Sequence, residues 1–326
     1  MKFAILGGGG CFGLNFARFL IRHGHEAIGC GRSALRGPAF TLGADQMGYR
    51  YRPYQVGPDN EFIAEWLHTE RPDVIVNFAA QGEGAASYRS RSWKYYYATN
   101  VDALVDLTER LFTADWLQRF VQVSTSEVYG SVDAPASESA PLHPTSPYAV
   151  SKLAFDMHLQ SIARIWKFPG VICRPSNCVT PGQQLHRVVP KTLLLALTGR
   201  KLQLHGGGIA RKAYMDADDL SGALLKLARH GQVGEVYNAG PQGTVSIREL
   251  VELCAMSIGR SMSETVEEVG DRTGQDACYW LDSRKMLGLG WQPEVAIATA
   301  VESVHAWVHQ HLDVLRGMPT EFEMRA

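Results

Sequence analysis

The sequence predicts an α/β protein with a doubly wound parallel sheet and a smaller C-terminal lobe. Short β-rich runs alternate with helical patterns through residues 1–175, and alternation of this kind produces a parallel sheet covered by helices on both faces. After about residue 180 the alternation loosens, and glycine- or proline-rich turns interrupt it at Pro181-Gly182, at 206–208 and at 241–243. These two observations separate a regular sheet domain from a less regular second lobe.

The expected strands are short and apolar, and the helices between them are amphipathic. The helix expected at 14–23, for example, carries Phe16, Phe19 and Leu20 on one face. Ligands of a doubly wound sheet bind beyond the carboxyl ends of its strands, so functional residues are expected there. Strands are expected at 3–6, 26–30, 74–78, 120–123 and 170–173, and helices at 14–23, 62–67, 101–112 and 148–166.

The domain organisation follows from the same pattern. Residues 1–175 are expected to form the sheet domain, with parts of 205–240 returning to it, and residues 176–314 are expected to form mainly the second lobe. Within that lobe, Ser246 and Glu249 have the spacing of a capping box that begins a helix. The tail, residues 315–326, shows no clear periodicity, and we expect it to be poorly ordered.

Composition excludes several classes of protein. The 326 residues carry a formal net charge of -1 and are 45% apolar, which is ordinary globular composition without the basic excess of a nucleic-acid-binding protein. No apolar run is long enough to span a bilayer, and the N-terminus lacks a signal-peptide cleavage site, so we expect a cytoplasmic protein without a membrane partner. The six scattered cysteines predict reduced thiols and no metal site.

A glycine-rich loop separates the first strand from the first helix. Gly7, Gly10 and Gly13 form G-x-x-G-x-x-G, and Cys11 and Phe12 lie between the last two glycines. Such glycines permit a tight turn, a close approach of the backbone to a pyrophosphate and close packing of helix on strand, while the helix N-terminus favours phosphate. The loop therefore predicts a Rossmann-type domain that binds a nicotinamide dinucleotide.

The end of the second strand indicates which dinucleotide binds. A carboxylate about 20 residues after the glycine loop typically holds the ribose hydroxyls of NAD. This chain has Gly31, Arg32 and Ser33 at that point. Because a guanidinium group binds phosphate in a bidentate manner, Arg32 and Ser33 favour the extra phosphate of NADP, with NAD as the alternative.

Two further motifs predict the chemistry. Tyr148 and Lys152 are four residues apart on one face of a helix, where the ammonium lowers the phenol pKa and lets Tyr148 act as a base. Thr125, Ser126 and Glu127 follow a strand directly, at the edge where the site of an α/β enzyme forms. Thr125 is suited to hydrogen-bond a reacting hydroxyl, and Glu127 is a candidate base or acid.

Together these residues resemble the extended short-chain dehydrogenase/reductase family, and within it the nucleotide-sugar epimerases and dehydratases. The resemblance covers nearly the whole chain. Beyond the motifs above, it includes Asn77 to Gln81, Asn100, Arg174 to Asn177, Pro181 to Pro190, Gly234 to Gly240, Asp271 to Asp276 and Trp280 to Asp282.

The resemblance implies roles for residues that no motif assigns on its own. Besides the glycine loop, Arg32, Ser33, Tyr148 and Lys152, the cofactor-binding residues it implies are Ala79, Ala80, Gln81, Asn100, Ser124, Pro175 and Ser176. The substrate, a nucleotide-diphosphate sugar, is expected to contact Asn177, Arg187, Val188, His205, either Arg211 or Lys212, and Arg272. Of these, Arg272 and the residue at 211 or 212 are expected to hold the diphosphate, and His205 to line the base pocket.

The catalytic turn departs from one branch of the family. Enzymes that resemble dTDP-glucose 4,6-dehydratases usually carry Thr-Asp-Glu, whereas Thr125-Ser126-Glu127 is more similar to GDP-mannose 4,6-dehydratases and UDP-glucuronate decarboxylases. The Asp usual near the adenine is replaced around Gln55-Val56. The base and the sugar of the substrate therefore stay open.

We expect a 4,6-dehydratase. Tyr148 takes the proton of the sugar 4-hydroxyl as hydride leaves C4, Glu127 removes the C5 proton, water leaves from C6, and hydride returns there. A 4-epimerase would use Tyr148 and Lys152 without Glu127, and a uronic acid decarboxylase would need a cation such as Arg187. A protein that only senses NADP(H) would turn over no nucleotide sugar.

The helix expected at 148–166 also predicts an assembly. Its apolar residues, more than one face needs, are Leu153, Phe155, Met157, Leu159 and Ile162. The family that the chain resembles pairs through two long helices, one of which carries the Tyr-Lys pair. We therefore expect a homodimer with an isologous interface.

Overall fold

The computed structural model describes residues 1–82, 93–270 and 276–322, and these residues confirm the predicted fold. Within them, seven strands form one sheet in the order β11-β6-β5-β4-β1-β2-β3, with every neighbouring pair parallel. The strands are β1 (Lys2–Leu6), β2 (Glu26–Cys30), β3 (Arg50–Arg52), β4 (Val74–Asn77), β5 (Arg119–Val123), β6 (Gly170–Pro175) and β11 (Val236–Ala239).

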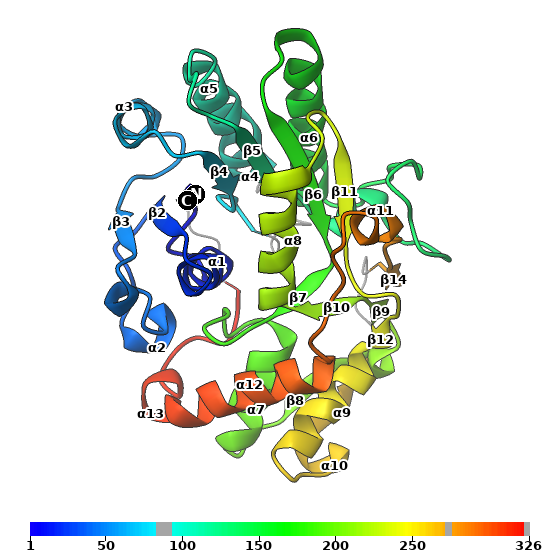
Figure 1. The fold of residues 1–326 in the computed structure, drawn as a ribbon. Coiled ribbons are helices and arrows are strands. Elements are labelled where there is room, and N and C mark those ends of the chain that lie inside the picture. Colours follow the sequence, from blue (N-terminus) through cyan, green and yellow to red (C-terminus); the bar gives the residue numbers. More distant parts are fainter. Residues whose placement is uncertain (83–92, 271–275, 323–326) are drawn as a thin grey trace.

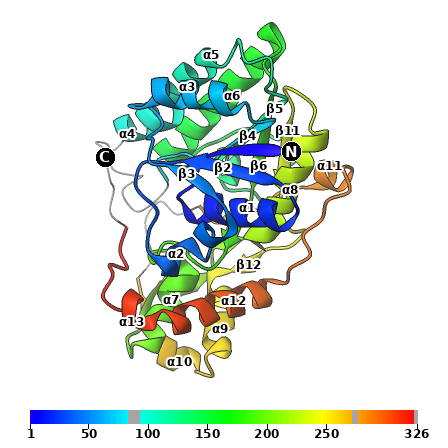
Figure 2. The same ribbon diagram turned by 60° about the vertical axis from the view of Figure 1, so that its left-hand side comes forward.

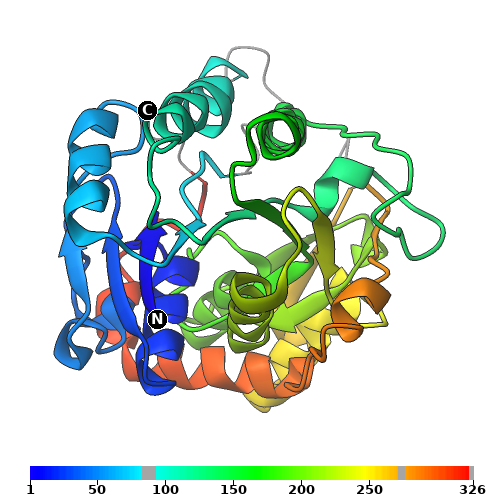
Figure 3. The same ribbon diagram turned by 45° about the horizontal axis from the view of Figure 1, so that its top comes forward.

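Helices cover both faces of this sheet (Figures 1 and 3). Successive side chains of β1 are apolar and point to opposite faces of the sheet, so both faces need cover. Phe3 and Ile5 pack with α1 (Cys11–Arg22) and α8 (Ala217–His230), whereas Ala4 and Leu6 pack with the helices of the other face. Those helices are α3 (Asn60–Glu70), α5 (Ala103–Arg110) and α6 (Pro147–Trp166). Burial on both faces explains the nearly continuous apolar sequence of the strands.

The helix expected at 101–112 has a different course. It begins as α4 (Trp93–Tyr97), continues through a π-helical turn, η3 (Ala98–Asp102), and ends as α5 at Arg110. The wide turn places Asn100 in the interior, where the side chain is fully buried. Wide turns of this kind often occur at functional sites.

The second lobe is built on three packed helices, α7 (Val188–Leu197), α9 (Ile247–Ser257) and α12 (Ile297–Gln310). The capping box expected at Ser246 is present: its Oγ accepts a 3.0 Å hydrogen bond from Glu249 N, and Glu249 Oε2 accepts one of 2.7 Å from Ser246 N. Trp307 of α12 joins this lobe to the sheet domain, because its Nε1 donates a 2.6 Å hydrogen bond to the carbonyl of Ala39 in α2 (Pro38–Thr41).

Small sheets and short helices complete the chain. The small sheets pair β7 (Asn177–Val179) with β10 (Tyr214–Asp216), β8 (Leu202–His205) with β13 (Val266–Val269), and β9 (Arg211–Lys212) with both β12 (Val245–Ser246) and β14 (Cys278–Tyr279). The short helices are η1 (Asp45–Met47), η4 (Ser126–Tyr129), η5 (Gly206–Gly208), α10 (Met262–Thr265), α11 (Arg284–Leu287) and α13 (Leu312–Leu315). In the described part of the chain, no helix is long and apolar enough to cross a membrane.

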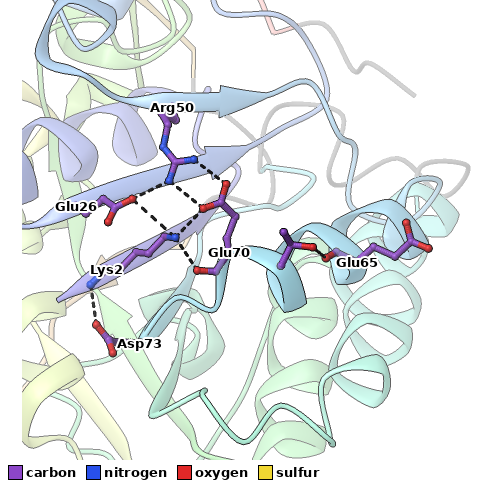
Figure 4. Close-up of polar contacts among 7 residues, drawn as sticks. Lys2, Glu26, Arg50, Glu65, Glu70 and Asp73 are labelled. Atoms are coloured by element: carbon purple, nitrogen blue, oxygen red, sulfur yellow. Dashed lines mark hydrogen bonds and ion pairs between the residues drawn. The ribbon is translucent and has the colours of Figure 1, made fainter.

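An ion-pair network ties together the amino ends of the first strands (Figure 4). Glu70, at the end of α3, accepts hydrogen bonds of 2.6 Å from Lys2 Nζ and of 2.7 and 2.9 Å from the guanidinium of Arg50. Arg50 also contacts Glu26 at 2.7 Å, and Asp73 accepts a 2.8 Å hydrogen bond from Lys2 N. The hydrogen bonds from Arg50 and Lys2 lower the pKa of Glu70 to about 2.

Candidate active site

A large cleft opens at the carboxyl ends of the sheet strands, as expected for a doubly wound fold. Its volume is about 1670 Å³, and both the sheet domain and the second lobe line it. The predicted site residues that line it are Gly7, Gly10, Cys11, Phe12, Gly13, Arg32, Ser33, Ala79, Ala80, Gln81, Ser124, Thr125, Ser126, Glu127, Tyr148, Lys152, Pro175, Ser176, Asn177, Arg187, Val188, His205 and Lys212.

The glycine loop has no room for side chains at two of its three positions. Gly7 has φ 75°, and a Cβ there would lie 2.6 Å from the backbone nitrogen of Ala79; a Cβ on Gly13 would lie 2.6 Å from the carbonyl oxygen of Gly7. Helix α1 follows with Gly10 as its N-cap, without a side-chain cap and without an acidic residue in its first turn. The free N–H groups of this turn are therefore available to an anion.

Two tyrosines, one in β3 and one just before it, hydrogen-bond to the backbone near this loop. The Tyr49 hydroxyl donates a 3.1 Å hydrogen bond to the Gly8 carbonyl, and a Cβ on Gly29 would lie 1.8 Å from the same hydroxyl. The Tyr51 hydroxyl donates a 2.7 Å hydrogen bond to the Ser33 carbonyl. No sequence motif marks either tyrosine, because their partners are backbone atoms of loops that are distant in the sequence.

The end of β2 presents cations to the cleft. Arg32, Ser33 and Arg36 all line it, and the described lining residues from 31 to 58 include no aspartate or glutamate. Burial raises the pKa of the Cys11 thiol to about 11, although the charges of Arg187 and Arg36 oppose the rise. Both guanidinium groups therefore lie near the start of α1, and Arg36 is a cleft residue that sequence reasoning missed.

The turn that follows β5 is shaped by Thr125. Its backbone is extended, and its Oγ1 accepts a 3.2 Å hydrogen bond from the backbone nitrogen of Glu127, so Thr125 caps η4. Glu127 is 8% exposed and lies at the cleft. A carboxylate with so little access to water is placed to exchange protons with a bound molecule rather than with solvent.

Helix α6 carries Tyr148 and Lys152. Ser146 caps the helix, its side chain accepting from Ala149 N, and Pro147 occupies the first turn. Lys152 is 2% exposed, and its ammonium donates a 2.7 Å hydrogen bond to the Val123 carbonyl. Burial lowers the pKa of Lys152 to about 8, and the negative charge of Asp156 opposes this shift. The Tyr148 ring packs edge-on against Tyr96, with centroids 6.1 Å apart.

Asn100 lies beneath the cleft rather than at its surface. Its Oδ1 accepts a 2.7 Å hydrogen bond from Gln81 N, and its Nδ2 donates to the Gln81 carbonyl and to Ser151 Oγ. Asn100 thus fixes the Gln81 backbone against α6. Its contacts assign it to the support of a cleft-lining loop.

Of the two candidate residues at positions 211 and 212, only Lys212 lines the cleft. Arg211 turns away from the cleft and contacts Thr244 and Glu249, with distances of 2.8 to 3.2 Å. Lys212 lines the cleft and lies over the Tyr279 ring, 4.6 Å from its centroid. Arg272 lies outside the described residues.

The tail, which the sequence predicts to be poorly ordered, contacts the rim of the cleft. Figure 2 shows it in red, running from α13 toward the sheet. Glu321 Oε1 pairs with Lys191 Nζ at 2.6 Å, and the Phe322 ring packs edge-on against His186 at 5.1 Å. Burial lowers the pKa of His186 to about 4, with further lowering by Arg187 and Lys191. Sequence reasoning missed these residues, since the tail carries no periodic signal.

Comparisons with known proteins agree with this geometry. The profile of the NAD dependent epimerase/dehydratase family matches residues 3–240. A human dTDP-D-glucose 4,6-dehydratase is 34% identical over 259 residues, which are 78% of this chain and 73% of the human protein. A solved dTDP-glucose 4,6-dehydratase from Streptomyces venezuelae with NAD bound superposes with a TM-score of 0.88 and 29% identity, covering 96% of this chain and 98% of that one. The same enzyme from Bacillus anthracis, in complex with NAD, gives 0.85 and 28% over the same shares.

Proposed function

This chain belongs to the NAD dependent epimerase/dehydratase family, and we propose that it is a nucleotide-sugar 4,6-dehydratase that uses Glu127 for the elimination step. The observation that carries the proposal is the position of Glu127. It lies with Thr125, Tyr148 and Lys152 along one cleft that also contains the glycine loop. A 4-epimerase has no use for a buried carboxylate beside the reacting sugar, whereas removal of a proton from C5 requires a base.

The residues around the glycine loop fit a nicotinamide dinucleotide. Gly7 and Gly13 leave backbone exposed where a side chain would block a pyrophosphate, and the first turn of α1 has no competing carboxylate. When bound, the nicotinamide accepts a hydride from the sugar and later returns it. We propose NADP as the cofactor, because Arg32, Ser33 and Arg36 line the cleft at the end of β2, where guanidinium groups suit the extra phosphate of NADP.

The proposed reaction involves no net oxidation. Tyr148, with the Lys152 ammonium one helical turn away, takes the 4-hydroxyl proton as C4 becomes a ketone. Thr125 donates a hydrogen bond to the same oxygen. The ketone acidifies the C5 proton, Glu127 removes it, and that proton leaves with the C6 hydroxyl as water. The C5–C6 double bond is then saturated by a hydride at C6 and a proton at C5, which leaves a 4-keto-6-deoxy sugar.

The substrate-binding side of the cleft supports a nucleotide-diphosphate sugar as substrate. Arg187 and Lys212 supply cations for the diphosphate, and Asn177, Val188 and His205 line the rest of this side. Lys191 lies at the rim, paired with Glu321. Arginine and lysine bind phosphate oxygens through charge-assisted hydrogen bonds, the stronger kind in proteins.

The outer face of α6 supports a homodimer. Met157 is 61% exposed, Ile165 56% and Trp166 62%, and Trp166 packs against the exposed Phe112 with ring centroids 5.6 Å apart. Met157, Ser161 and Ile165 lie one helical turn apart on the same face. Of the apolar residues that motivated the prediction, Phe155, Leu159 and Ile162 are buried in the core instead. The exposed apolar side chains of this long helix suit an isologous contact with the same helix of a second copy.

Incubation of the cofactor-loaded enzyme with a panel of nucleotide sugars tests the function. A product lighter than its substrate by one water identifies the substrate and supports the dehydratase. Glu127→Gln should then slow the elimination by about 10² to 10⁴-fold, the usual contribution of a general base, while reduced nicotinamide and undehydrated 4-keto sugar accumulate. Glu109→Gln, on the exposed side of α5, is the control and should behave as wild type. A Glu127→Gln enzyme at the wild-type rate, with a product of unchanged mass, would establish an epimerase instead.

A further inference from the structure

A buried polar chain connects the two parts of the proposed chemistry. Arg174, on β6, is 2% exposed, and Asp156, on α6, is fully buried. Arg174 Nε donates a 3.1 Å hydrogen bond to Asp156 Oδ2, and the same oxygen accepts a 2.8 Å hydrogen bond from Ser124 Oγ. Asp156 lies one helical turn beyond Lys152, which lies one turn beyond Tyr148. One end of the guanidinium is therefore fixed to α6, the helix that carries Tyr148 and Lys152, the pair proposed for the oxidation step.

The other end of the guanidinium is fixed to the catalytic turn. Arg174 Nη1 donates a 3.0 Å hydrogen bond to the Tyr129 hydroxyl, and the guanidinium carbon lies 5.2 Å from the Tyr129 ring centroid. Tyr129 is the last residue of η4 and is 2% exposed. Its hydroxyl donates in turn a 2.8 Å hydrogen bond to Asn238 Oδ1 on β11. The phenol is thus held from two sides.

Tyr129 has little freedom to move without moving Glu127. The two residues lie in the same short turn, which closes when Gly130 N donates a 3.1 Å hydrogen bond to the Glu127 carbonyl. Gly130 has φ 68°, and a Cβ there would lie 2.3 Å from the His143 carbonyl oxygen. Val128, between Glu127 and Tyr129, is fully buried. A displacement of the Tyr129 hydroxyl is therefore transmitted to the Glu127 backbone.

We propose that Arg174 is a positioning residue that holds the elimination base, Glu127, in register with the oxidation pair, Tyr148 and Lys152, by bridging Asp156 on α6 to Tyr129 on η4. The inference rests on the proposed dehydratase function. A planar guanidinium fixes two partners in one geometry, which a lysine ammonium at the same site cannot do. Burying such a charge gives little net stability, so a role in fixing geometry accounts better for its presence than a role in stabilising the core.

Tyr129→Phe tests the bridge, since it removes the hydroxyl and keeps the ring under the guanidinium. Tyr237→Phe is a matched control: Tyr237 is also 2% exposed, its hydroxyl accepts a hydrogen bond from Gln232 N, and Lys285 Nζ lies 4.3 Å from its ring centroid. Tyr237 does not line the cleft. Both variants lose one buried phenol hydroxyl next to a cation, so their melting temperatures measure the structural cost of that loss.

The readout separates the two half-reactions. With the substrate that the panel identifies, single-turnover absorbance of reduced nicotinamide follows oxidation, and product mass follows loss of water. We expect Tyr129→Phe to oxidise the sugar at nearly the wild-type rate and to eliminate water up to about 10²-fold more slowly, as expected for a misplaced catalytic group. Arg174→Lys, which keeps the charge beside Asp156 but cannot also reach Tyr129, should show the same split. Tyr237→Phe should change neither rate.

Three results would overturn the inference. Tyr129→Phe and Tyr237→Phe could be indistinguishable in both rates, so that the bridge has no effect on Glu127. Tyr129→Phe could slow oxidation and elimination in equal proportion, as a loosened core would. A wild-type enzyme that turns over nucleotide sugars without losing water would remove the proposed function itself, and that failure is visible before any variant is made.

Discussion

Lys152 donates a 2.7 Å hydrogen bond from its buried ammonium to the carbonyl of Val123, the last residue of β5. The contact ties α6 to the strand that leads directly into Ser124 and Thr125. It also places a positive charge one helical turn from the Tyr148 phenol, without a solvent shell to compensate for it. In the proposed mechanism, the protonation state of Lys152 therefore controls how readily Tyr148 acts as a base.

The pH dependence of turnover should report this control. Because burial lowers the pKa of Lys152 to about 8, the ammonium is present below that pH and is lost as the pH rises through it. A Tyr148 phenolate then has no neighbouring positive charge to stabilise it, so kcat/KM should fall above about pH 8. Lys152→Arg keeps a cation that does not lose its proton in this range, so its profile should stay flat there at a lower absolute rate. An identical fall in both enzymes would show that another group controls this limb.

Cofactor preference should depend on Arg32. A charge-assisted hydrogen bond contributes about 1.5–3 kcal/mol, which corresponds to a preference of roughly 10- to 150-fold for NADPH over NADH. Arg32→Ala should remove the preference in titration calorimetry. Arg52→Ala is the control, because Arg52 is an exposed arginine of the neighbouring strand that does not line the cleft. Equal affinities of the wild-type protein for the two cofactors would disprove the assignment.

The dimer should depend on the outer face of α6. The double variant Met157→Glu/Ile165→Glu places two charges among the exposed apolar side chains of α6, and we expect it to be monomeric by light scattering at micromolar concentration, where we expect the wild type to be dimeric. Met256→Glu changes an equally exposed methionine, 67% accessible, on α9 of the second lobe, and it should leave the assembly unchanged. A wild-type protein that is monomeric under these conditions contradicts the prediction directly.

Local signals predicted many of the residues that line the cleft. The glycine loop is recognisable because its steric requirements act within one turn, and Tyr148 and Lys152 are recognisable because helical spacing alone puts them on one face. The strands were predictable where burial on both faces makes them continuously apolar. In contrast, β3 consists of Arg50, Tyr51 and Arg52, and no apolar run marks it. The contacts of Tyr49 with Gly8 and of Tyr51 with Ser33, at and next to this strand, are ones that only the fold creates.

Other features depend on contacts between distant segments, or on which side of a very short strand each side chain lies. Strand β9 contains only Arg211 and Lys212, so its sequence cannot show which side chain faces the cleft; the pairing with β12 and β14 decides this. The bridge through Arg174 joins residues from α6, β6 and η4 that are 18 and 45 positions away from it. The tail reaches Lys191 across 130 positions. No periodicity or motif encodes pairings of this range.

Acid stability should depend on Glu70, at the end of the sheet opposite the cleft. Its pKa lies near 2 in the folded protein, below the ordinary value of 4.5, because Arg50 and Lys2 donate hydrogen bonds to the ionised carboxylate. A carboxyl group whose pKa is lowered by folding stabilises the protein above the unfolded pKa, and this contribution is lost as the pH falls from about 4.5 to 2.

Glu70→Gln should therefore lower the melting temperature at pH 7, and its difference from wild type should shrink progressively below pH 4.5. Glu65→Gln removes a carboxylate of the same helix that lies away from the network in Figure 4. Its melting temperature should match that of the wild type at pH 7 and throughout the range below pH 4.5. A Glu70→Gln deficit that persists undiminished toward pH 2 would mean that the side chain stabilises α3 by packing rather than by its charge.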